Sequence, residues 1–152
     1  MTKIGAVFQF EAPSGWTEIR EGSRHIFHGP NREELIVSVS LIQGIGTTRD
    51  LRVVQQRFFQ NAEQSVKNAV AHPALKVTQP FQRDASASKI ECWTLLAQTL
   101  DGGMVFYQKV FHDPRGILLA TFEGPNTANG TNAFEQFAKS VAVISDSEAL
   151  VE

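Results

Sequence analysis

The stretch KIECWTLLAQTLDGGMVFYQKVFHDPRGILLATF, residues 89–122, decides the fold of this chain. Asp101-Gly102-Gly103 suits a hairpin turn, because Asp-Gly and Gly-Gly accept positive φ. Asp113-Pro114-Arg115-Gly116 has the composition of a second tight turn. The strands predicted beside these turns cover 89–99, 104–111 and 117–122. Two hairpins in succession predict an antiparallel meander.

The first 42 residues predict another meander. Residues 35–42 are rich in Val and Ile, which is typical of a strand. Shorter strands are predicted over 6–10, 16–20 and 24–28. Turn residues separate them, at Pro13-Ser14-Gly15, Glu21-Gly22-Ser23 and Gly29-Pro30-Asn31. A further strand over 75–81 is placed at a sheet edge, because Pro80 cannot donate a backbone hydrogen bond to a neighbour.

Two amphipathic helices are predicted after the meanders. Apolar residues recur at spacings of three and four from Leu51 to Ala69, and His72-Pro73 ends this helix. The second helix is expected to begin near Thr131 or Asn132, because Asn132 and Glu135 have the spacing of a capping box. Its apolar stripe consists of Phe134, Phe137, Val141 and Ile144.

The predicted order is therefore β-meander, long helix, β-meander, helix. Neither meander can bury both of its faces alone, so we expect the two to join into one sheet with helices on its faces. The fold class is α+β, an α/β/α sandwich with a central, mainly antiparallel sheet. Residues 1–145 form a single domain in this prediction, and residues 146–152 form a frayed acidic tail.

Composition bounds the class of protein. The chain has 152 residues, 42% of them hydrophobic and 20% charged, which is the balance of one globular domain. Eleven Phe residues against one Tyr predict a core of rings without polar groups. A net charge of −2 without clustered Lys or Arg argues against binding to nucleic acid or a membrane surface. The sequence has no apolar run typical of a secretory signal or a membrane-spanning helix, so we expect the chain to be cytoplasmic. Cys92 is its only cysteine, so no disulfide can form within the chain.

Side chains capable of chemistry are scattered. His25 and His28 lie three apart on a strand and should point to opposite faces, so they cannot easily share a metal. His112-Asp113 lacks an accompanying Ser or Cys motif. Cys92 is interpreted as a small core residue. Four acids are interpreted from their spacing as isolated surface residues: Glu33, Glu34, Asp84 and Asp101. We predict no catalytic residue, no cofactor and no metal site.

Phe58 and Phe59 are the candidate contact residues. Adjacent helical residues diverge by about 100°, so one ring faces the sheet and the other lies near the edge of the buried stripe. The pair is either part of a wide core stripe or an apolar patch for a partner protein.

The segment Phe10-Glu11-Ala12-Pro13-Ser14-Gly15-Trp16 follows a short strand and resembles the opening of PsbP-like, Mog-like and DcrB-like domains. The later layout is similar too, with Phe58-Phe59 on a helix, Trp93 in a long strand, and Gln108-Lys109-Val110-Phe111 before the last strand and helix. The resemblance implies an α/β/α sandwich without shared catalytic residues. Within this group the chain suits the cytoplasmic bacterial branch, which is similar to Eag-type chaperones of type VI secretion effectors. We also expect Trp16 to be largely buried.

We therefore expect a non-catalytic protein-binding module. It is either a bacterial secretion-associated chaperone or adaptor, which should expose apolar surface, or an immunity protein that inhibits a cognate toxin through polar and acidic groups. The alternative is a small-molecule carrier with a pocket between sheet and helix. An enzyme would need convergent polar groups in a cleft. Open sheet edges and the surplus of Phe also predict a homodimer or a partner at a sheet edge or face.

Overall fold

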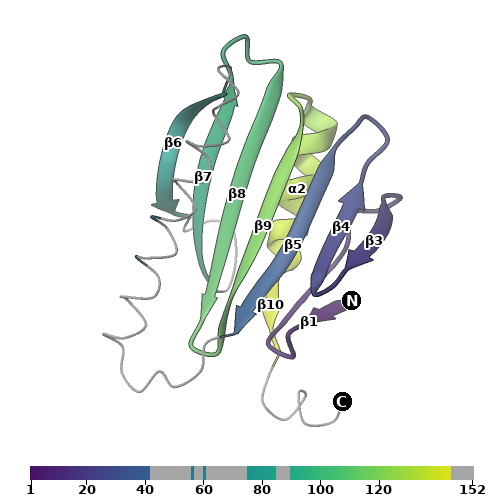
Figure 1. Cartoon of the computed structure of the whole chain (residues 1–152), viewed down its shortest axis with the longest axis vertical. Helices are drawn as coiled ribbons and strands as arrows, with labels where there is room; N and C mark the ends of the chain where they lie inside the picture. Colours follow the sequence, from purple (N-terminus) through teal and green to yellow (C-terminus); the bar gives the residue numbers. More distant parts are fainter. Residues whose placement is uncertain (42–55, 57–59, 61–74, 85–89, 145–152) are drawn as a thin grey trace.

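The computed structural model describes residues 1–41, 56, 60, 75–84 and 90–144, and it forms two antiparallel sheets and a helix. The larger sheet has seven strands in the order β3-β4-β5-β9-β8-β7-β6, and the smaller has the order β1-β2-β10 (Figure 1). The elements are β1 Thr2–Ile4, β2 Phe8–Phe10, β3 Thr17–Glu21, β4 Arg24–His28, β5 Glu34–Leu41, β6 Leu75–Arg83, β7 Glu91–Thr99, β8 Met104–Asp113, β9 Gly116–Pro125, α2 Ala128–Ser140 and β10 Ala142–Val143.

Two meanders join in one sheet, but the strand predicted over 6–10 is not part of the first one, because β2 lies in the smaller sheet. Strands β3, β4 and β5 form the first, and β6 to β9 form the second. They meet where β5 pairs antiparallel with β9, with Val37 opposite Ala120. The strand expected at a sheet edge is β6, which lies at one end of the strand order. The fold class is α+β, as the sequence predicted.

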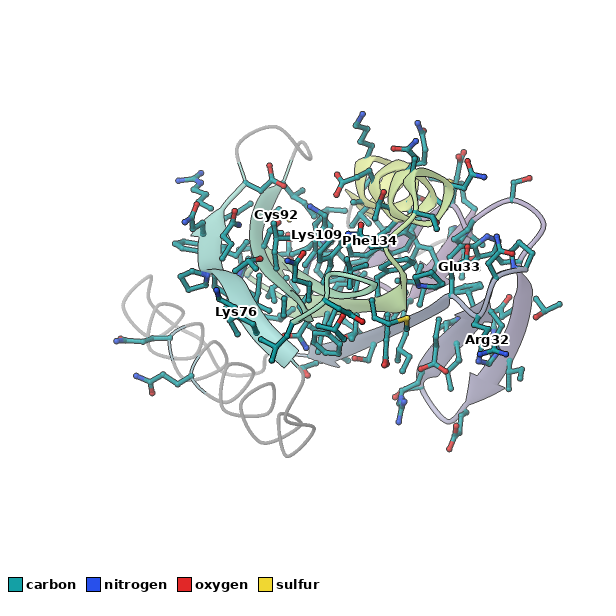
Figure 2. All side chains as sticks on the ribbon, turned by 90° about the horizontal axis from the view of Figure 1, so that it is seen from above. Arg32, Glu33, Lys76, Cys92, Lys109 and Phe134 are labelled. Carbon is teal, nitrogen blue, oxygen red and sulfur yellow. The ribbon has the colours of Figure 1, made fainter. Side chains whose placement is uncertain are left out.

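Helix α2 lies across one face of the large sheet (Figures 1 and 2). We call this face the helix face and the opposite one the far face. On β8, Val105, Tyr107, Lys109 and Phe111 belong to the helix face, and alternate residues belong to the far face. The predicted first helix, with Phe58 and Phe59, lies outside the described residues, as does the predicted acidic tail. Of the predicted α/β/α sandwich, the described residues therefore include the sheet and the helix layer on its helix face.

The start of α2 differs from the predicted capping box at Asn132. The helix begins at Ala128, and its N-cap is Thr127, whose hydroxyl accepts a hydrogen bond from the Gly130 N–H at 3.3 Å. The Thr127 backbone is extended, with φ −119° and ψ 151°, as an N-cap requires. The helix begins about one turn earlier than predicted because Thr127 provides an N-cap, and its hydroxyl satisfies an N–H group that would otherwise lack a partner.

Phenylalanine rings fill the layer between the sheet and α2. Seven of the eleven are at most 1% exposed: Phe8, Phe10, Phe27, Phe111, Phe122, Phe134 and Phe137. Phe134 stacks on Phe122 with ring centroids 5.3 Å apart, and Phe10 meets Phe137 edge-on at 5.1 Å. The prediction that the Phe surplus builds the core is confirmed for these rings.

The small sheet ties the N-terminal strands to the end of α2. Strand β10 pairs with β2, and Ile144 N–H donates to the Val7 carbonyl at 2.7 Å. Sequence reasoning missed both β1 and β10. Trp16 was expected to be largely buried, but it is half-buried at the border of the core, 6.4 Å from the Phe122 ring. It follows the turn at Pro13-Ser14-Gly15, and its indole lies against Gly29, where an added Cβ would come within 2.8 Å of the ring.

Candidate functional site

The two histidines singled out in the sequence occupy opposite faces of β4, as predicted. His25 belongs to the helix face, where its ring stacks on Phe27 and its Nδ1 lies 2.8 Å from Glu18 Oε1. His28 is opposite Glu34 in the neighbouring strand, with Nε2 3.0 Å from Glu34 Oε2. Each histidine therefore has its own carboxylate. Among the described residues, no group of three His, Cys, Asp or Glu could hold a metal ion.

Cys92 is part of the core, as predicted. It is 0% exposed and packs with Phe111 and its neighbours on the helix face. Burial raises the pKa of the Cys92 thiol to about 12, so the thiol stays protonated at neutral pH. A protonated, enclosed thiol is a poor nucleophile.

Glu33 is not a surface acid, which corrects the prediction from spacing. It is 2% exposed and lies against three glycines, Gly29, Gly124 and Gly130. Its Oε1 accepts a hydrogen bond from the Asn31 N–H at 2.6 Å. A Cβ on Gly124 would come within 3.2 Å of the Glu33 Cα, so the close approach of β9 to Glu33 leaves little room for a side chain at position 124. The carboxylate thus fixes the Gly29–Asn31 turn against β9 and α2.

Asp84 is not isolated either, because it belongs to a cluster around Lys109. The Lys109 side chain is 2% exposed, and its Nζ lies 3.0 Å from Asp84 Oδ2 and 3.1 Å from Thr94 Oγ1. Glu135 Oε1 is farther away, at 3.5 Å. We call these four residues the Lys109 cluster. Figure 2 shows Lys109 between the sheet and α2, near Phe134, whose ring centroid is 5.8 Å from Nζ.

The sheet itself assembles this cluster. Thr94 on β7 is directly opposite Lys109 on β8. Strand β6 has two register shifts, between Val77 and Gln79 and between Gln79 and Gln82. Asp84 follows the second irregularity, and its N–H donates to the Cys92 carbonyl at 2.8 Å, which holds the carboxylate over the helix face. Helix α2, which lies across this face of the sheet, contributes Glu135.

A cleft of about 440 Å³ opens over the Lys109 cluster, between β6, β7 and α2. Its lining residues are Gln79, Gln82, Arg83, Asp84, Thr94, Leu96, Lys109 and Glu135. Two cationic and two anionic side chains balance each other, and the rest are amides, a hydroxyl and Leu96. Such a lining suits hydrogen bonding to a small polar molecule. It does not bring a nucleophile together with a base.

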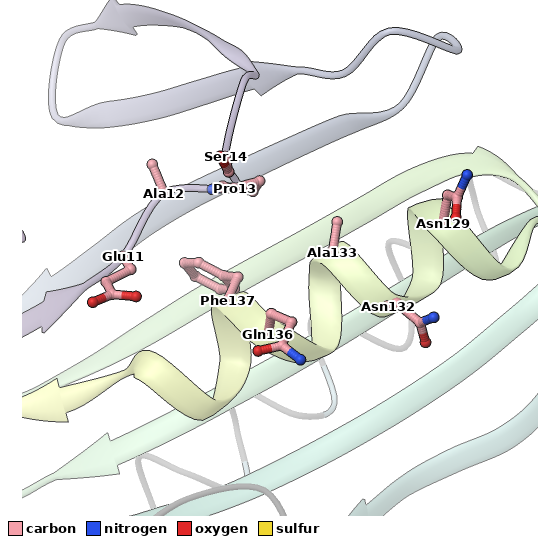
Figure 3. A pocket seen from close by; sticks show the side chains of 9 residues that line it. All are labelled: Glu11, Ala12, Pro13, Ser14, Asn129, Asn132, Ala133, Gln136 and Phe137. Atoms are coloured by element: carbon pink, nitrogen blue, oxygen red, sulfur yellow. The ribbon is translucent and has the colours of Figure 1, made fainter.

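A second hollow, of about 390 Å³, lies between the turn after β2 and α2. Figure 3 shows Glu11 and Ser14 on one side, and Asn132 and Gln136 on the helix. Phe137 closes its base and is 1% exposed, because the ring belongs to the core. The polar groups here are exposed side chains on a surface groove, so we do not assign a ligand site to it.

The outermost strand β3 carries the clearest exposed apolar feature. All five of its residues are exposed. On the far face, Ile19 is opposite Ile26 on β4, and Ile26 is opposite Ile36 on β5. Exposure is 52% for Ile19, Ile26 is buried and Ile36 is half-buried. We call these three residues the isoleucine strip. It runs across three strands to an open sheet edge.

His112 on the far face should make the free energy of unfolding depend on pH. It is 6% exposed, and burial lowers the pKa of its imidazole from 6.5 to about 4. Below pH 6.5 the unfolded chain binds a proton that the folded chain refuses, so the free energy of unfolding should fall as the pH drops toward 4. The loss attributable to this group is at most about 3 kcal/mol.

Urea unfolding at pH 7 and pH 4.5 checks this expectation. His112→Gln cannot titrate, so its loss of stability between the two pH values should be smaller than that of the wild type. Gln108→Ala is the matched control, because it changes another buried polar side chain of the far face without removing a titratable group, and it should keep the wild-type slope. An equal slope in the wild type and His112→Gln would contradict the assignment.

The fold that these elements define, a broad antiparallel sheet with a C-terminal helix on one face, is PsbP-like. It is similar to LpqN, involved in cell envelope biogenesis of Mycobacterium tuberculosis (TM-score 0.63, 14% identity, 91% of this chain and 83% of that chain). It is also similar to the cyanobacterial PsbP (CyanoP) of Synechocystis sp. PCC 6803 (TM-score 0.56, 17% identity, 91% and 94%). A protein of Bacteroides thetaiotaomicron VPI-5482 matches with TM-score 0.54 and 12% identity over 96% of this chain and 48% of that one.

These likenesses concern the fold alone, because the sequence identities are low. No protein-family model matches the chain, and no curated protein matches it. No helix within the described residues is long and apolar enough to cross a membrane.

Proposed function

We propose that this protein is a non-catalytic module that binds another protein, in the manner of a cytoplasmic secretion-associated chaperone or adaptor. The observation that carries the proposal is the isoleucine strip, which brings apolar side chains to the exposed edge of the sheet. A chaperone or adaptor needs such a surface, because apolar contact with a client supplies most of the binding free energy.

The surroundings of the strip resemble the rim of a protein interface. Glu21 and Arg24 lie on the far face beyond Ile19 and Ile26, and His28 and Glu34 lie on the other side of the strip. An apolar centre within a polar rim is the usual anatomy of an interface between proteins. An exposed small-molecule site would instead be concave.

The charge of this hairpin favours an adaptor over an inhibitor of a toxin. Across β3 and β4, Glu18 and Glu21 are balanced by Arg20 and Arg24. An immunity protein that blocks a basic catalytic cleft would present an acidic surface. The hairpin instead offers apolar contact with neutral overall charge.

Site-specific photo-crosslinking in the source organism tests this proposal. A photoreactive amino acid is placed at Ile19 and, separately, at Ser38 on the far face of β5. Gln136 and Lys139, exposed on the outer side of α2, provide the matched control positions. We expect one partner protein to be crosslinked from positions 19 and 38 but not from positions 136 and 139.

The crosslinked protein is then identified, purified and titrated by calorimetry. Ile19→Asp should weaken its binding at least tenfold, because a charge replaces an apolar contact at the centre of the interface. Equal crosslinking at all four positions, or an unchanged affinity of Ile19→Asp, would overturn the proposal.

A second candidate function is carriage of a small polar molecule in the cleft above the Lys109 cluster. It is favoured by the position of the cleft between sheet and helix and by its amide and hydroxyl lining. The balanced charges of Lys109, Arg83, Asp84 and Glu135 suit a zwitterion better than a simple ion.

Amide chemical-shift mapping with a mixture of free amino acids tests this second function. Binding should shift the backbone amides of Thr94, Leu96 and Lys109, and leave those of Glu18 and Arg20 on the remote strand β3 unchanged. Spectra that do not respond to millimolar amino acids would exclude this class of ligand.

A further inference from the structure

We infer that two copies of this chain join at strand β3 in a two-fold symmetric, antiparallel pair centred on Ile19. In this pair, Glu18 of each copy is opposite Arg20 of the other, and the two Ile19 side chains meet. The dimer goes beyond the proposed function, because it concerns the edge of the sheet and leaves the far face accessible to a partner.

Strand β3 has an open side. It is the last strand in the sheet order, and within the described part of the chain it pairs only with β4. All five residues are exposed, with Arg20 at 66% and Glu18 at 35% of their side chains. An edge strand with accessible backbone groups is a template for another strand.

The β3–β4 turn determines which backbone groups point outward. Gly22-Ser23 is a two-residue loop, with φ +64° at Gly22, and it closes on the pair of Glu21 and Arg24. The residues that close such a loop are hydrogen-bonded to each other. Because bonded and non-bonded pairs alternate, Ile19 also bonds toward β4, whereas Glu18 and Arg20 direct their N–H and C=O groups to the open side.

A two-fold axis at Ile19 matches these outward groups. Glu18 of one copy is then opposite Arg20 of the other, and the two residues exchange both of their backbone hydrogen bonds. The Ile19 pair occupies the intervening non-hydrogen-bonded site, where side chains approach most closely. Every outward backbone group between residues 18 and 20 thereby gains a partner.

The side chains select this register over its neighbours. Centring the pair on Glu18 or on Arg20 would also match outward backbone groups, but it would place two like charges opposite each other. Centring it on Ile19 pairs opposite charges twice on the helix face. Within one chain, Arg20 Nε already lies 3.2 Å from Glu18 Oε1, so these side chains occupy the same exposed region of that face.

The far face gains a continuous apolar row. With the two Ile19 residues in contact, the isoleucine strip of one copy continues into that of the other across both sheets. Pairing brings the two Ile19 side chains, each 52% exposed in the single chain, into contact at the sheet edge and leaves their outer surface on the far face open. The pair of short strands buries a modest area, so we expect a dimer that dissociates at micromolar concentration.

The opposite edge of the sheet lacks these properties. Strand β6 contains Pro80 and two register shifts, and Lys76 and Arg83 are exposed along it. Proline, irregular register and positive charge are the features by which proteins block pairing at an edge. The two edges thus differ, and β3 alone presents a regular, self-complementary strand.

Sedimentation equilibrium with charge-reversal variants tests the dimer. The mass of the wild type should rise with concentration from 16.8 kDa toward twice that value. Glu18→Arg and Arg20→Glu each place like charges opposite each other and should remain monomeric. An equimolar mixture of these two variants restores opposite charges at both positions and should dimerise, as should the double variant Glu18→Arg/Arg20→Glu.

The controls separate this register from a general effect of charge. Arg24→Glu changes the same kind of charge on β4 and should still dimerise, as should Lys76→Glu on the opposite edge. Circular dichroism confirms that each variant is folded. A wild-type mass that stays at 16.8 kDa up to millimolar concentration, a dimeric Glu18→Arg variant, or a mixture that stays monomeric would overturn the dimer.

The dimer and the proposed function can fail separately. The monomeric Glu18→Arg variant keeps the isoleucine strip and should still bind the crosslinked partner protein. A dimeric wild type whose positions 19 and 38 crosslink only to a second copy would uphold the dimer and refute the proposed function. A monomeric wild type that crosslinks to another protein would do the reverse.

Discussion

Replacing Asp84 with Ala should lower the free energy of unfolding by about 3–5 kcal/mol, because it leaves the Lys109 ammonium buried without its main counter-charge. Lys109 is 2% exposed at its side chain, and Asp84 Oδ2 is 3.0 Å from its Nζ. The remaining carboxylate, Glu135, is at 3.5 Å and 47% exposed, so it compensates only in part. Urea unfolding at pH 7, followed by Trp fluorescence, measures the change.

Replacing Lys109, the other member of the ion pair, should lower the free energy of unfolding by less. Lys109→Met removes the buried charge and keeps most of the length of the side chain, while Asp84, at 20% exposure, retains access to water and its bond from Thr94 Oγ1. The double variant Asp84→Ala/Lys109→Met should therefore be more stable than Asp84→Ala alone. A double variant less stable than Asp84→Ala would show that Lys109 contributes in some way other than as the partner of Asp84.

The strands were largely predictable because the turns that define them consist of adjacent residues. In the Asp101-Gly102-Gly103 turn, Gly102 has φ +73°, and Asp101 Oδ1 accepts a hydrogen bond from the Gly103 N–H at 2.9 Å. The turn is therefore stabilised by residues that are adjacent in the sequence. The same holds for β4, whose bounds match the prediction. The register of β3 on β4 follows from the two-residue turn at Gly22-Ser23, so the pairing of Ile19 with Ile26 was also accessible to sequence reasoning.

Elements whose partners are distant in sequence were not predictable. Strand β10 has two residues and exists because β2, far along the chain, pairs with it. Asp84 reaches Lys109 only because β6 shifts register twice, and no local pattern marks those shifts. The alternation of side chains along β8 does give one signal of the Lys109 cluster. It places Lys109 on the same face of the strand as Val105, Tyr107 and Phe111. A lysine within a buried row needs an acidic partner.

The start of α2 shows how two local signals compete. Asn132 and Glu135 have capping-box spacing, but the chain has an earlier hydroxyl at Thr127 in an extended backbone. Starting at Ala128 lets Gly130 lie against Glu33, where an added Cβ would come within 3.3 Å of the Glu33 Cγ. The contact of Gly130 with a buried carboxylate from another part of the chain therefore accompanies the Thr127 cap, and local sequence patterns do not reveal this contact.

Phe134→Ala should also destabilise the fold by about 3–5 kcal/mol, because it opens a cavity in the centre of the aromatic layer. Phe134 is 0% exposed, and its ring lies 5.3 Å from Phe122 and 6.2 Å from Phe137. The loss should fall in the upper half of this range, since the same ring also lies below the Lys109 ammonium, 5.8 Å from its centroid.

Two further variants resolve the contributions of Phe134. Phe134→Leu keeps much of the apolar volume and should lose less stability than Phe134→Ala, with the remaining loss assigned to the ring contacts. Gln136→Ala, two residues along α2, changes an exposed side chain and should shift the urea midpoint little. If Phe134→Ala unfolds at the wild-type urea concentration, helix α2 does not hold the helix face of the sheet in the way that these contacts require.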